Sequence, residues 1–359
     1  MTILVSGIEV GSVRALIPVC LELIRNGNKI LIEKKGHFEV ELVKELSSVL
    51  IAIPENKKDL EDFLIDKKIS KVLFSVNVHD TRPLIIARIA QKLDIKTFHL
   101  LDYWHDYKAR MERDGKKIFL PTIYFVPDDF AFKKAVEEGI PSEIIKVSGQ
   151  PALENINSKY NDASLQEDPF IDLKSKNRKI ILFVSEPVTQ DQGGSYKENS
   201  NYRGYTEFSV LKILINALNI LDKKITIIIL PHPRQDNDNL INFWELEGGK
   251  KFGDVYLNLN SRNTLPFVDG VIGMASTLLF EAFLVGKTVL SIQPDLRNNP
   301  FEMLENRNGF ELIKKYNNAD QKVVKWFTNL NIPLQSNLKE ENGVYKNSSK
   351  RIVNEILKI

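Results

Sequence analysis

This sequence has little cysteine, a small net charge and no long apolar run. Cys20 is the only cysteine among 359 residues, which excludes an internal disulfide and a cysteine-based metal cluster. The 49 Lys and Arg residues nearly balance the 47 Asp and Glu residues, leaving a net charge of +2. Proteins that bind nucleic acid usually carry a basic surplus, so we expect no nucleic-acid partner.

The apolar runs are too short for a membrane-spanning protein. The longest cover residues 180–184 and 225–230, far below the roughly 20 residues that cross a bilayer. The first residues, MTILVSG, lack the basic region and the long apolar core of a secretory signal. We therefore expect a cytoplasmic protein without a transmembrane segment, and the sequence indicates no oligomeric state.

Residues that would hold a metal are also missing from the expected places. No cluster of Cys and His at metal-ligand spacing is found, and no Asp-x-Asp pair follows a predicted strand. We expect neither a metal nor another cofactor.

The sequence does contain a regular alternation of short apolar runs and helical patterns. In the first half, the apolar runs predict strands at 3–7, 29–33, 49–53, 71–76, 96–102, 122–127 and 143–149. The second half repeats the arrangement, with strands predicted at 180–185, 225–231, 255–259, 270–274 and 288–292. Strands separated by helices of about ten residues imply parallel sheets covered by helices.

Two such halves predict two domains. A polar stretch without periodicity, at 157–179, separates them. We place the first domain at 1–152, the second at 153–342 and a terminal helix at 343–359. Ligands of open parallel sheets bind beyond the carboxyl ends of the strands, so the loops that follow the strands should hold the functional residues.

The most informative motif is GVIGMASTLLFEAFLVGKTVLSIQP, at 270–294. Ser276 opens a helix, and the first turn of a helix has unpaired N–H groups that bind a diphosphate readily. The hydroxyls of Ser276 and Thr277 would add two donors. Glu281 lies one turn further along the same face, where its carboxylate would accept the hydroxyls of a ribose. The competing interpretation is that Ser276 only caps the helix and Glu281 is solvated.

A second motif, LPHPRQD at 230–236, directly follows a buried strand. His232 would hydrogen-bond a phosphate or a base, and Arg234 would clamp a phosphate with two N–H groups. Alternatively, His232 is a satisfied histidine at a strand end and Arg234 is a surface charge. The motif by itself does not decide between the two.

The segment SGIEVGSVRAL, at 6–16, joins the first strand to the first helix. Gly11 and Ser12 at the start of this helix suit the close approach of a phosphate or an acceptor molecule, and Glu9 is a candidate base. The complete G-x-G-x-x-G pattern is missing, so the segment does not predict a dinucleotide site.

The segment HLLDYWHDY, at 99–107, places Asp102, His105 and Asp106 after a strand and among aromatic residues. Acidic groups beside aromatic surfaces suit sugar binding or the removal of a proton from an acceptor hydroxyl. Packing of the aromatic rings between domains is the competing interpretation. If the segment is functional, Asp102 is the candidate base.

Several segments resemble, in the same order, the bacterial GT-B superfamily that holds UDP-N-acetylglucosamine 2-epimerases and related glycosyltransferases. They are VSGQPALENI, FVSEPVTQD, GYTEFSVLKILINAL, LPHPRQD and GMASTLLFEAFLVGKTVLSIQP. The resemblance implies an α/β GT-B fold, in which two Rossmann-like domains have parallel sheets facing an interdomain cleft. Residues 1–152 would form the acceptor side and 153–342 the nucleotide-binding domain. His232, Ser276, Thr277 and Glu281 would contact the nucleotide.

The same resemblance implies an enzyme. Where the epimerases carry an acidic-Ser-Gly-Gly segment, this chain has GMAST, so we expect a metal-independent glycosyltransferase of surface glycan or glycoconjugate biosynthesis. Its donor would be a UDP-sugar, or else a CMP- or CDP-linked compound, and its acceptor a glycan or a lipid-linked molecule. The alternatives are a UDP-sugar 2-epimerase, a hydrolysing variant of it, and a non-catalytic GT-B-like binding protein.

The expected mechanism divides the work between the two halves. The helix start at Ser276, with Arg234 or His232, would stabilise the departing diphosphate. Asp102 or Glu9 would remove the acceptor proton, and closure of the domains would exclude water. The predicted catalytic residues are therefore Asp102, Glu9 and His232. The predicted binding residues are Gly11, Ser12, His232, Arg234, Ser276, Thr277 and Glu281.

Overall fold

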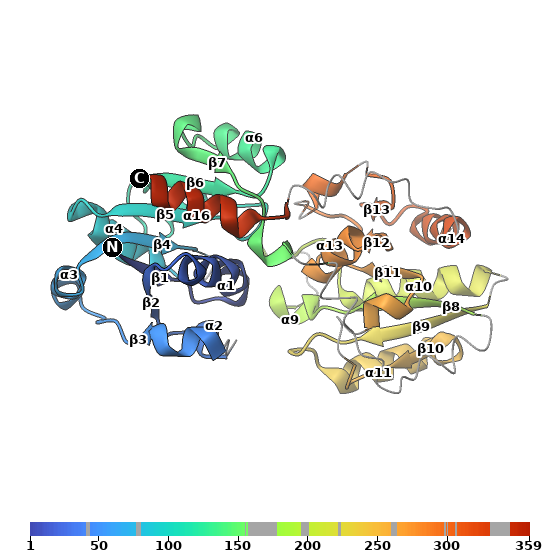
Figure 1. The fold of residues 1–359 in the computed structure, drawn as a ribbon. Coiled ribbons are helices and arrows are strands. Elements are labelled where there is room, and N and C mark those ends of the chain that lie inside the picture. The colour runs from blue at the N-terminus through green and yellow to red at the C-terminus, as the bar shows by residue number, and fades with distance from the viewer. Residues whose placement is uncertain are drawn as a thin grey trace. The chain divides into compact units, whose positions relative to one another are not determined.

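The chain is divided into two compact units, each built on one parallel sheet (Figure 1). Unit 1 is Met1–Asn155 with Glu340–Ile359, and unit 2 is Ile156–Lys339. The computed structural model describes residues 1–40, 44–76, 80–154, 156, 178–194, 201–221, 224–259, 264–297, 299, 301–305, 307–330 and 345–359. Most of the expected linker, residues 157–177, lies outside this described part.

The sheet of unit 1 has seven strands in the order β3-β2-β1-β4-β5-β6-β7, and all of its pairings are parallel. Its strands are β1 (Thr2–Ser6), β2 (Lys29–Glu33), β3 (Leu50–Ile51), β4 (Ile69–Phe74), β5 (Lys96–Leu100), β6 (Ile123–Val126) and β7 (Ile145–Val147). Its α-helices are α1 (Val10–Arg25), α2 (His37–Val40), α3 (Lys57–Asp66), α4 (Arg82–Lys92), α5 (Ala109–Glu112), α6 (Asp129–Glu137) and α16 (Ser348–Lys358). The chain runs from β1 out to β3 and then returns to β4 on the other side of β1, so the strand order reverses between β1 and β4.

The carboxyl-terminal helix belongs to the core of unit 1. Helix α16 lies beside α1 (Figure 1), and Ile352, Val353 and Ile356 join the same apolar cluster as the inward face of α1. The ammonium group of Lys71 on β4 donates a hydrogen bond of 2.6 Å to the carbonyl of Ile356. Burial of these apolar side chains, rather than chain order, places the helix in unit 1.

The sheet of unit 2 has six parallel strands in the order β10-β9-β8-β11-β12-β13. Its strands are β8 (Lys179–Val184), β9 (Ile225–Leu230), β10 (Gly253–Val255), β11 (Gly270–Gly273), β12 (Thr288–Ile292) and β13 (Phe310–Ile313). Its α-helices are α9 (Val188–Asp191), α10 (Glu207–Ile220), α11 (Asn237–Leu246), α13 (Thr277–Leu284) and α14 (Ala319–Asn329). Here the strand order reverses between β8 and β11.

Short 3₁₀ helices are also found among the described residues of the two units. They cover Lys44–Val49, Ser142–Ile144, Pro151–Leu153, Gly249–Phe252, Leu265–Phe267 and Glu302–Leu304. The two parallel sheets predicted from the alternation of apolar runs and helices are confirmed.

Unit 2 differs from the prediction in three elements. The bounds of the strand predicted at 255–259 were wrong, because the strand found there, β10, begins at Gly253 and ends at Val255. At Gly253 a Cβ atom would lie 1.8 Å from the carbonyl oxygen of Ile227 on β9. Only a residue without a side chain can pair with β9 there. Strand β13 and helix α14 were not predicted. Trp326 of α14 packs so closely on β11 that a Cβ at Gly270 would lie 2.8 Å from its ring.

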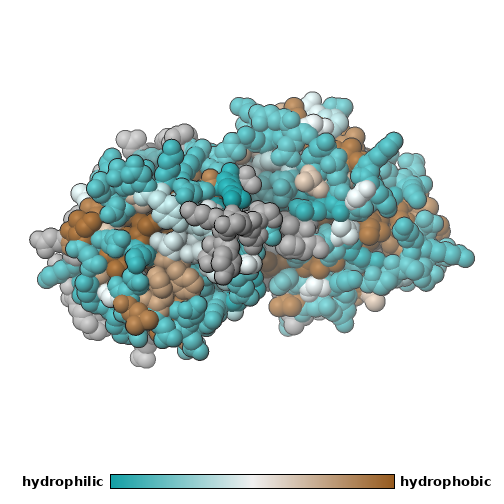
Figure 2. All heavy atoms as spheres, turned by 180° about the vertical axis from the view of Figure 1, so that it is seen from behind, coloured by the Kyte–Doolittle hydropathy of each residue, from teal (hydrophilic) through white to brown (hydrophobic). Residues whose placement is uncertain are grey.

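Hydrophilic residues cover most of the face of the molecule that Figure 2 shows, with apolar residues in small groups among them. Among the helices that the structure describes, none combines the length and the apolar character that crossing a membrane requires.

The packing of α16 predicts the effect of a substitution in it. Ile352→Ala removes a fully buried side chain and should lower the free energy of unfolding by about 2–5 kcal/mol. Leu357→Ala, on the exposed side of the same helix, should change it by less than about 0.5 kcal/mol. Urea denaturation, monitored by hydrogen exchange of the α1 amides, measures the free energy of unfolding of both variants. Equal effects of the two substitutions would show that α16 does not pack as described.

Candidate functional site

The loops after β8 and β11 meet where the strand order of unit 2 reverses. Helix α13 begins as predicted, with Ser276 as its N-cap and the Ser276 hydroxyl oxygen accepting a hydrogen bond of 3.3 Å from the Leu278 amide. Thr277 is exposed and Glu281 is partly exposed. The helix packs closely on the end of β11, because a Cβ at Gly273 would lie 2.8 Å from the Leu279 side chain. The first turn of α13 therefore stands at the carboxyl edge of the sheet.

The end of β11 is held in place from the next strand. The Ser291 hydroxyl and the Gln293 amide donate hydrogen bonds of 2.6 Å and 3.0 Å to the Met274 carbonyl. The Tyr205 hydroxyl in turn donates to the Gln293 side chain at 3.0 Å. Buried and paired polar groups of this kind fix the direction in which α13 starts.

A carboxylate of the chain itself lies at this helix start. Glu186, in the loop after β8, accepts a hydrogen bond of 2.6 Å from the Ala275 amide. Removal of Glu186 from water raises its pKa to about 7, although the Ala275 amide, the Arg203 guanidinium and the Ser276 amide favour the ionised form. The backbone just before α13 thus holds a carboxyl group of the chain itself.

His232 and Arg234 lie after β9, next to the loop that follows β8. The Arg234 amide donates to Nδ1 of His232 at 3.1 Å, so the neutral ring carries its proton on Nε2. Burial and the nearby Arg234 lower the pKa of His232, which favours this neutral form. The Arg234 guanidinium forms a bidentate ion pair with the Asp191 carboxylate, at 2.6 Å and 3.2 Å. This carboxylate raises the pKa of Arg234.

Beneath these residues lies a buried polar network that the sequence motifs did not indicate. The carboxylate of Glu207, at the start of α10, accepts hydrogen bonds from the amide and the hydroxyl of Thr189 at 2.8 Å and 2.7 Å. Gln235 links Glu207 to the Ser185 hydroxyl, at 3.3 Å and 3.0 Å. The network ties the loop after β8 to the loop after β9. The only signal for it in the sequence is the polar composition of SEPVTQDQ, at 185–192.

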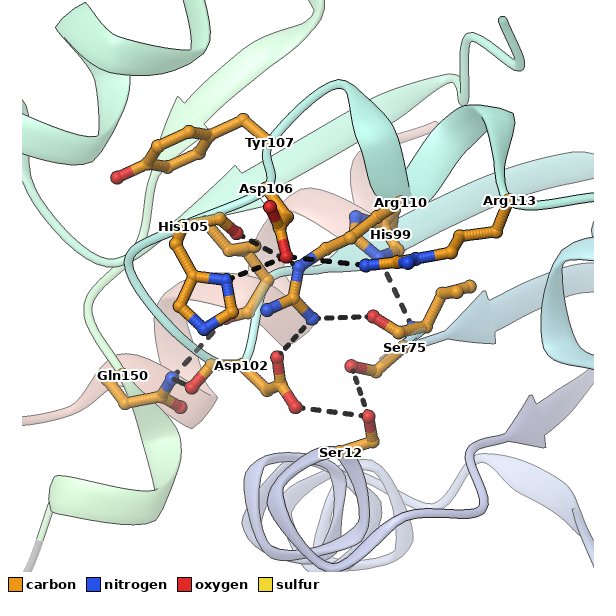
Figure 3. A network of polar contacts seen from close by, with 12 residues as sticks. Ser12, Ser75, His99, Asp102, His105, Asp106, Tyr107, Arg110, Arg113 and Gln150 are labelled. Carbon is orange, nitrogen blue, oxygen red and sulfur yellow. Dashed lines mark hydrogen bonds and ion pairs between the residues drawn. The ribbon is translucent and has the colours of Figure 1, made fainter. Parts of the chain in front are cut away.

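In unit 1, Ser12 and Asp102 are brought together in a second buried network (Figure 3). The Ser12 hydroxyl donates to Asp102 at 3.2 Å and accepts from the Ser75 hydroxyl at 3.1 Å. The Arg110 guanidinium, which is completely buried, donates to the other oxygen of Asp102 at 2.6 Å. Ser12 follows β1 and Ser75 follows β4, so this network lies at the strand reversal of unit 1.

The other first-half candidates lie nearer the surface. Glu9 is the N-cap residue of α1 and Gly11 lies in its first turn, and both are partly exposed. Asp102 differs from them, because its side chain is only 1% exposed. Its place in an ion pair with Arg110 favours a structural role, and its predicted role as the acceptor base stays untested.

His105 and Asp106, which follow Asp102 in the same loop, form an accessible pair of side chains. Nδ1 of His105 lies 3.0 Å from Oδ2 of Asp106, and the two side chains are 42% and 41% exposed. The Arg113 guanidinium donates to the same carboxylate at 3.3 Å. In the part of the chain that the structure describes, no group of three or more His, Cys, Asp and Glu side chains is arranged to hold a metal ion.

Solved structures show the same architecture over the whole chain. UDP-GlcNAc 2-epimerase from Neisseria meningitidis, bound to UDP-GlcNAc, is 16% identical, with complete coverage of both chains and a TM-score of 0.62. A glycosyltransferase from Rickettsia africae is 16% identical, with 99% of this chain and 97% of that chain covered and a TM-score of 0.66. HepE from Anabaena, in complex with UDP-glucose, is 12% identical, with complete coverage of both chains and a TM-score of 0.64. The chain has the GT-B fold.

The GT-B fold that the resemblance of the sequence motifs implied is therefore confirmed. At such low identities the likeness extends to the fold alone and not to the roles of individual residues. No protein-family model matches the sequence, and no curated protein does.

The network in unit 1 predicts a loss of stability when Asp102 is removed. Asp102→Ala leaves the completely buried Arg110 charge without its carboxylate, which should lower the free energy of unfolding by about 3–5 kcal/mol. Thermal unfolding of the purified variant measures the loss. Replacement of the exposed Asp62 by Ala, on α3 of the same unit, is the control and should have little effect. An Asp102→Ala variant as stable as the parent would argue against a structural role for the ion pair.

Proposed function

We propose that this chain is a metal-independent glycosyltransferase that binds the diphosphate of a nucleotide-sugar donor at the start of α13. The observation that carries the proposal is the hydrogen bond between the Ala275 amide and Glu186, since it supports anion binding at this helix start. The site lies where the strand order of unit 2 reverses, the usual ligand position in open parallel sheets. UDP-sugars bound to proteins of the same fold support the choice of a UDP-linked donor.

The groups around α13 suit the two phosphates. The exposed Thr277 hydroxyl and the N–H groups of the first turn supply donors. His232 presents Nε2–H in its neutral form and would add one further donor. Arg234 reaches a phosphate by exchanging its contact with Asp191. Together with the positive end of the helix dipole, these groups would stabilise the diphosphate as it departs.

Glu281 is assigned to the ribose. It follows Ser276 by five residues along α13, which corresponds to a rise of about 7.5 Å from the cap. A carboxylate at that height accepts both ribose hydroxyls while the phosphates rest on the first turn of the helix. One short helix would therefore bind both ends of the nucleotide diphosphate.

Unit 1 is assigned to the acceptor. Glu9 and Gly11, at the partly exposed start of α1, would contact it, with Ser12 and Asp102 forming the rigid support beneath them. A glycan or lipid-linked hydroxyl compound is the proposed class of acceptor, and the product would belong to a surface glycan or glycoconjugate.

A UDP-sugar 2-epimerase is the second candidate, favoured by the epimerases among the proteins with the same fold. The two activities differ in their need for an acceptor. An epimerase converts UDP-GlcNAc to its 2-epimer without any acceptor. A transferase releases UDP only when a second substrate takes the sugar. Chromatography of the products with and without acceptor separates them.

The ribose assignment predicts a difference between two nucleotides. The chain should bind UDP about 10–100-fold more tightly than 2′-deoxy-UDP, because a hydrogen bond to a charged group contributes about 1.5–3 kcal/mol. Glu281→Gln should lose most of this difference. Asp320→Asn, which changes a partly exposed carboxylate in the first turn of α14, is the matched control and should keep it.

Titration calorimetry of the six pairs, three proteins with two nucleotides each, measures these affinities. Absence of UDP binding by the unmodified chain would remove the proposed function, whereas equal affinity for the two nucleotides would remove only the role of Glu281.

Glu186 predicts a pH dependence of donor binding. Its ionised carboxylate occupies the Ala275 amide and repels a diphosphate, and the protonated form does so less. Because the pKa of Glu186 is raised to about 7, the affinity for UDP-glucose should fall by up to about tenfold between pH 6 and pH 8. Glu186→Gln should flatten this dependence. UDP-glucose is the suitable probe because its phosphates do not titrate in this range, and an unchanged slope in the variant would disprove the role of Glu186.

A further inference from the structure

The loop after β5 carries a histidine–carboxylate pair at the carboxyl edge of the sheet in unit 1. Nδ1 of His105 faces Oδ2 of Asp106, and Asp106 lies between the His105 ring and the Arg113 guanidinium (Figure 3). Asp106 adopts a left-handed backbone conformation, with φ of 58°. This conformation is uncommon for residues other than glycine, so neighbouring contacts must maintain it.

The loop is held from several sides. Nε of Arg110 donates to the His105 carbonyl at 3.1 Å, and the Gln150 amide donates to the Asp102 carbonyl at 2.7 Å. The Tyr103 ring meets the His105 ring edge to face, with centroids 5.1 Å apart. The imidazole is therefore fixed in direction although it is accessible, which is the arrangement expected of a preorganised functional group.

The hydrogen bond to Asp106 also selects the tautomer of His105. With the proton on Nδ1 directed to the carboxylate, Nε2 keeps its lone pair. Within the residues that the structure describes, Nε2 of His105 makes no hydrogen bond. The hydrogen bond from His105, with the nearby charges of His105, Arg110 and Arg113, lowers the pKa of Asp106, so its carboxylate stays ionised at neutral pH.

Asp102 is less well placed than His105 for this chemistry. Its side chain is 1% exposed, and its two oxygens accept hydrogen bonds from Arg110 and Ser12. A base must come within hydrogen-bond reach of the hydroxyl whose proton it takes. Of the two residues, only His105 presents an accessible atom that can accept a proton.

From this geometry we infer that His105, oriented by Asp106, is the general base that deprotonates the acceptor hydroxyl. The inference rests on the proposed transferase function. In the step, the hydroxyl proton moves to Nε2 of His105, and the hydroxyl oxygen forms the bond to the anomeric carbon. The bond from that carbon to the diphosphate oxygen breaks, and the diphosphate leaves with the electron pair.

The test combines turnover with donor binding. UDP release from UDP-glucose and UDP-GlcNAc is measured with p-nitrophenyl glycosides as acceptors, and UDP affinity is measured on the same preparations. His105→Gln should lower kcat by about 100-fold or more, with the donor KM and the UDP affinity within about twofold of the parent. Asp106→Asn should lower kcat by at least about tenfold. Glu112→Gln is the control and should not change kcat. This substitution also removes a carboxylate, 39% exposed, from an ion pair on the adjacent α5.

Chemical rescue separates a base from a merely structural histidine. Added imidazole should restore part of the kcat of His105→Ala, whereas a structural defect would not respond. Normal turnover of His105→Gln, or a parent chain that binds UDP but releases none with any acceptor, overturns the inference while the donor site stands. A parent chain that does not bind UDP removes the proposed function itself.

Discussion

The parallel pairing of β8 with β11 is the constraint on which the candidate donor site depends. The pairing aligns Val184 with Gly273, so that both strands end at the same level. Glu186 and Ala275 follow these ends within two residues and meet at 2.6 Å, although they are 89 positions apart in the sequence. The chain leaves β8 toward β9 and leaves β11 toward β12, so the loops diverge here, and Thr277 in the first turn of α13 is exposed.

Buried charge serves two different purposes in the two units. In unit 1, the buried Arg110 guanidinium is paired with the Asp102 carboxylate, and Arg110 also holds the loop that carries His105. In unit 2, Glu186 has mainly backbone amides as partners, and its removal from water is compensated only in part, so its pKa lies near neutrality. A compensated pair is suited to rigidity, whereas a carboxylate that titrates near neutral pH is suited to exchange with a ligand.

Much of the fold could be predicted from apolar periodicity. The start of α13 at Ser276 was predicted together with its strand, since a serine between an apolar run and a helical pattern is a local signal. Strand β13 and helix α14 were missed, although Val323, Trp326 and Phe327 show helical spacing and are buried. The role of Glu186 could not be predicted, because its partner Ala275 is close only after β8 and β11 have paired.

Short-range periodicity in the chain specified the alternation of strands and helices, the parallel sheets and the loops that carry polar residues, since each of these features is encoded within a few neighbouring positions. The packing of the folded chain determined which of those polar residues are accessible to solvent. Packing buried Asp102 against Arg110, left His105 and Asp106 exposed, and placed Glu186 on the amides of α13. Accessibility and pKa depend on groups far away in sequence, and these come together only when the sheets and helices have assembled.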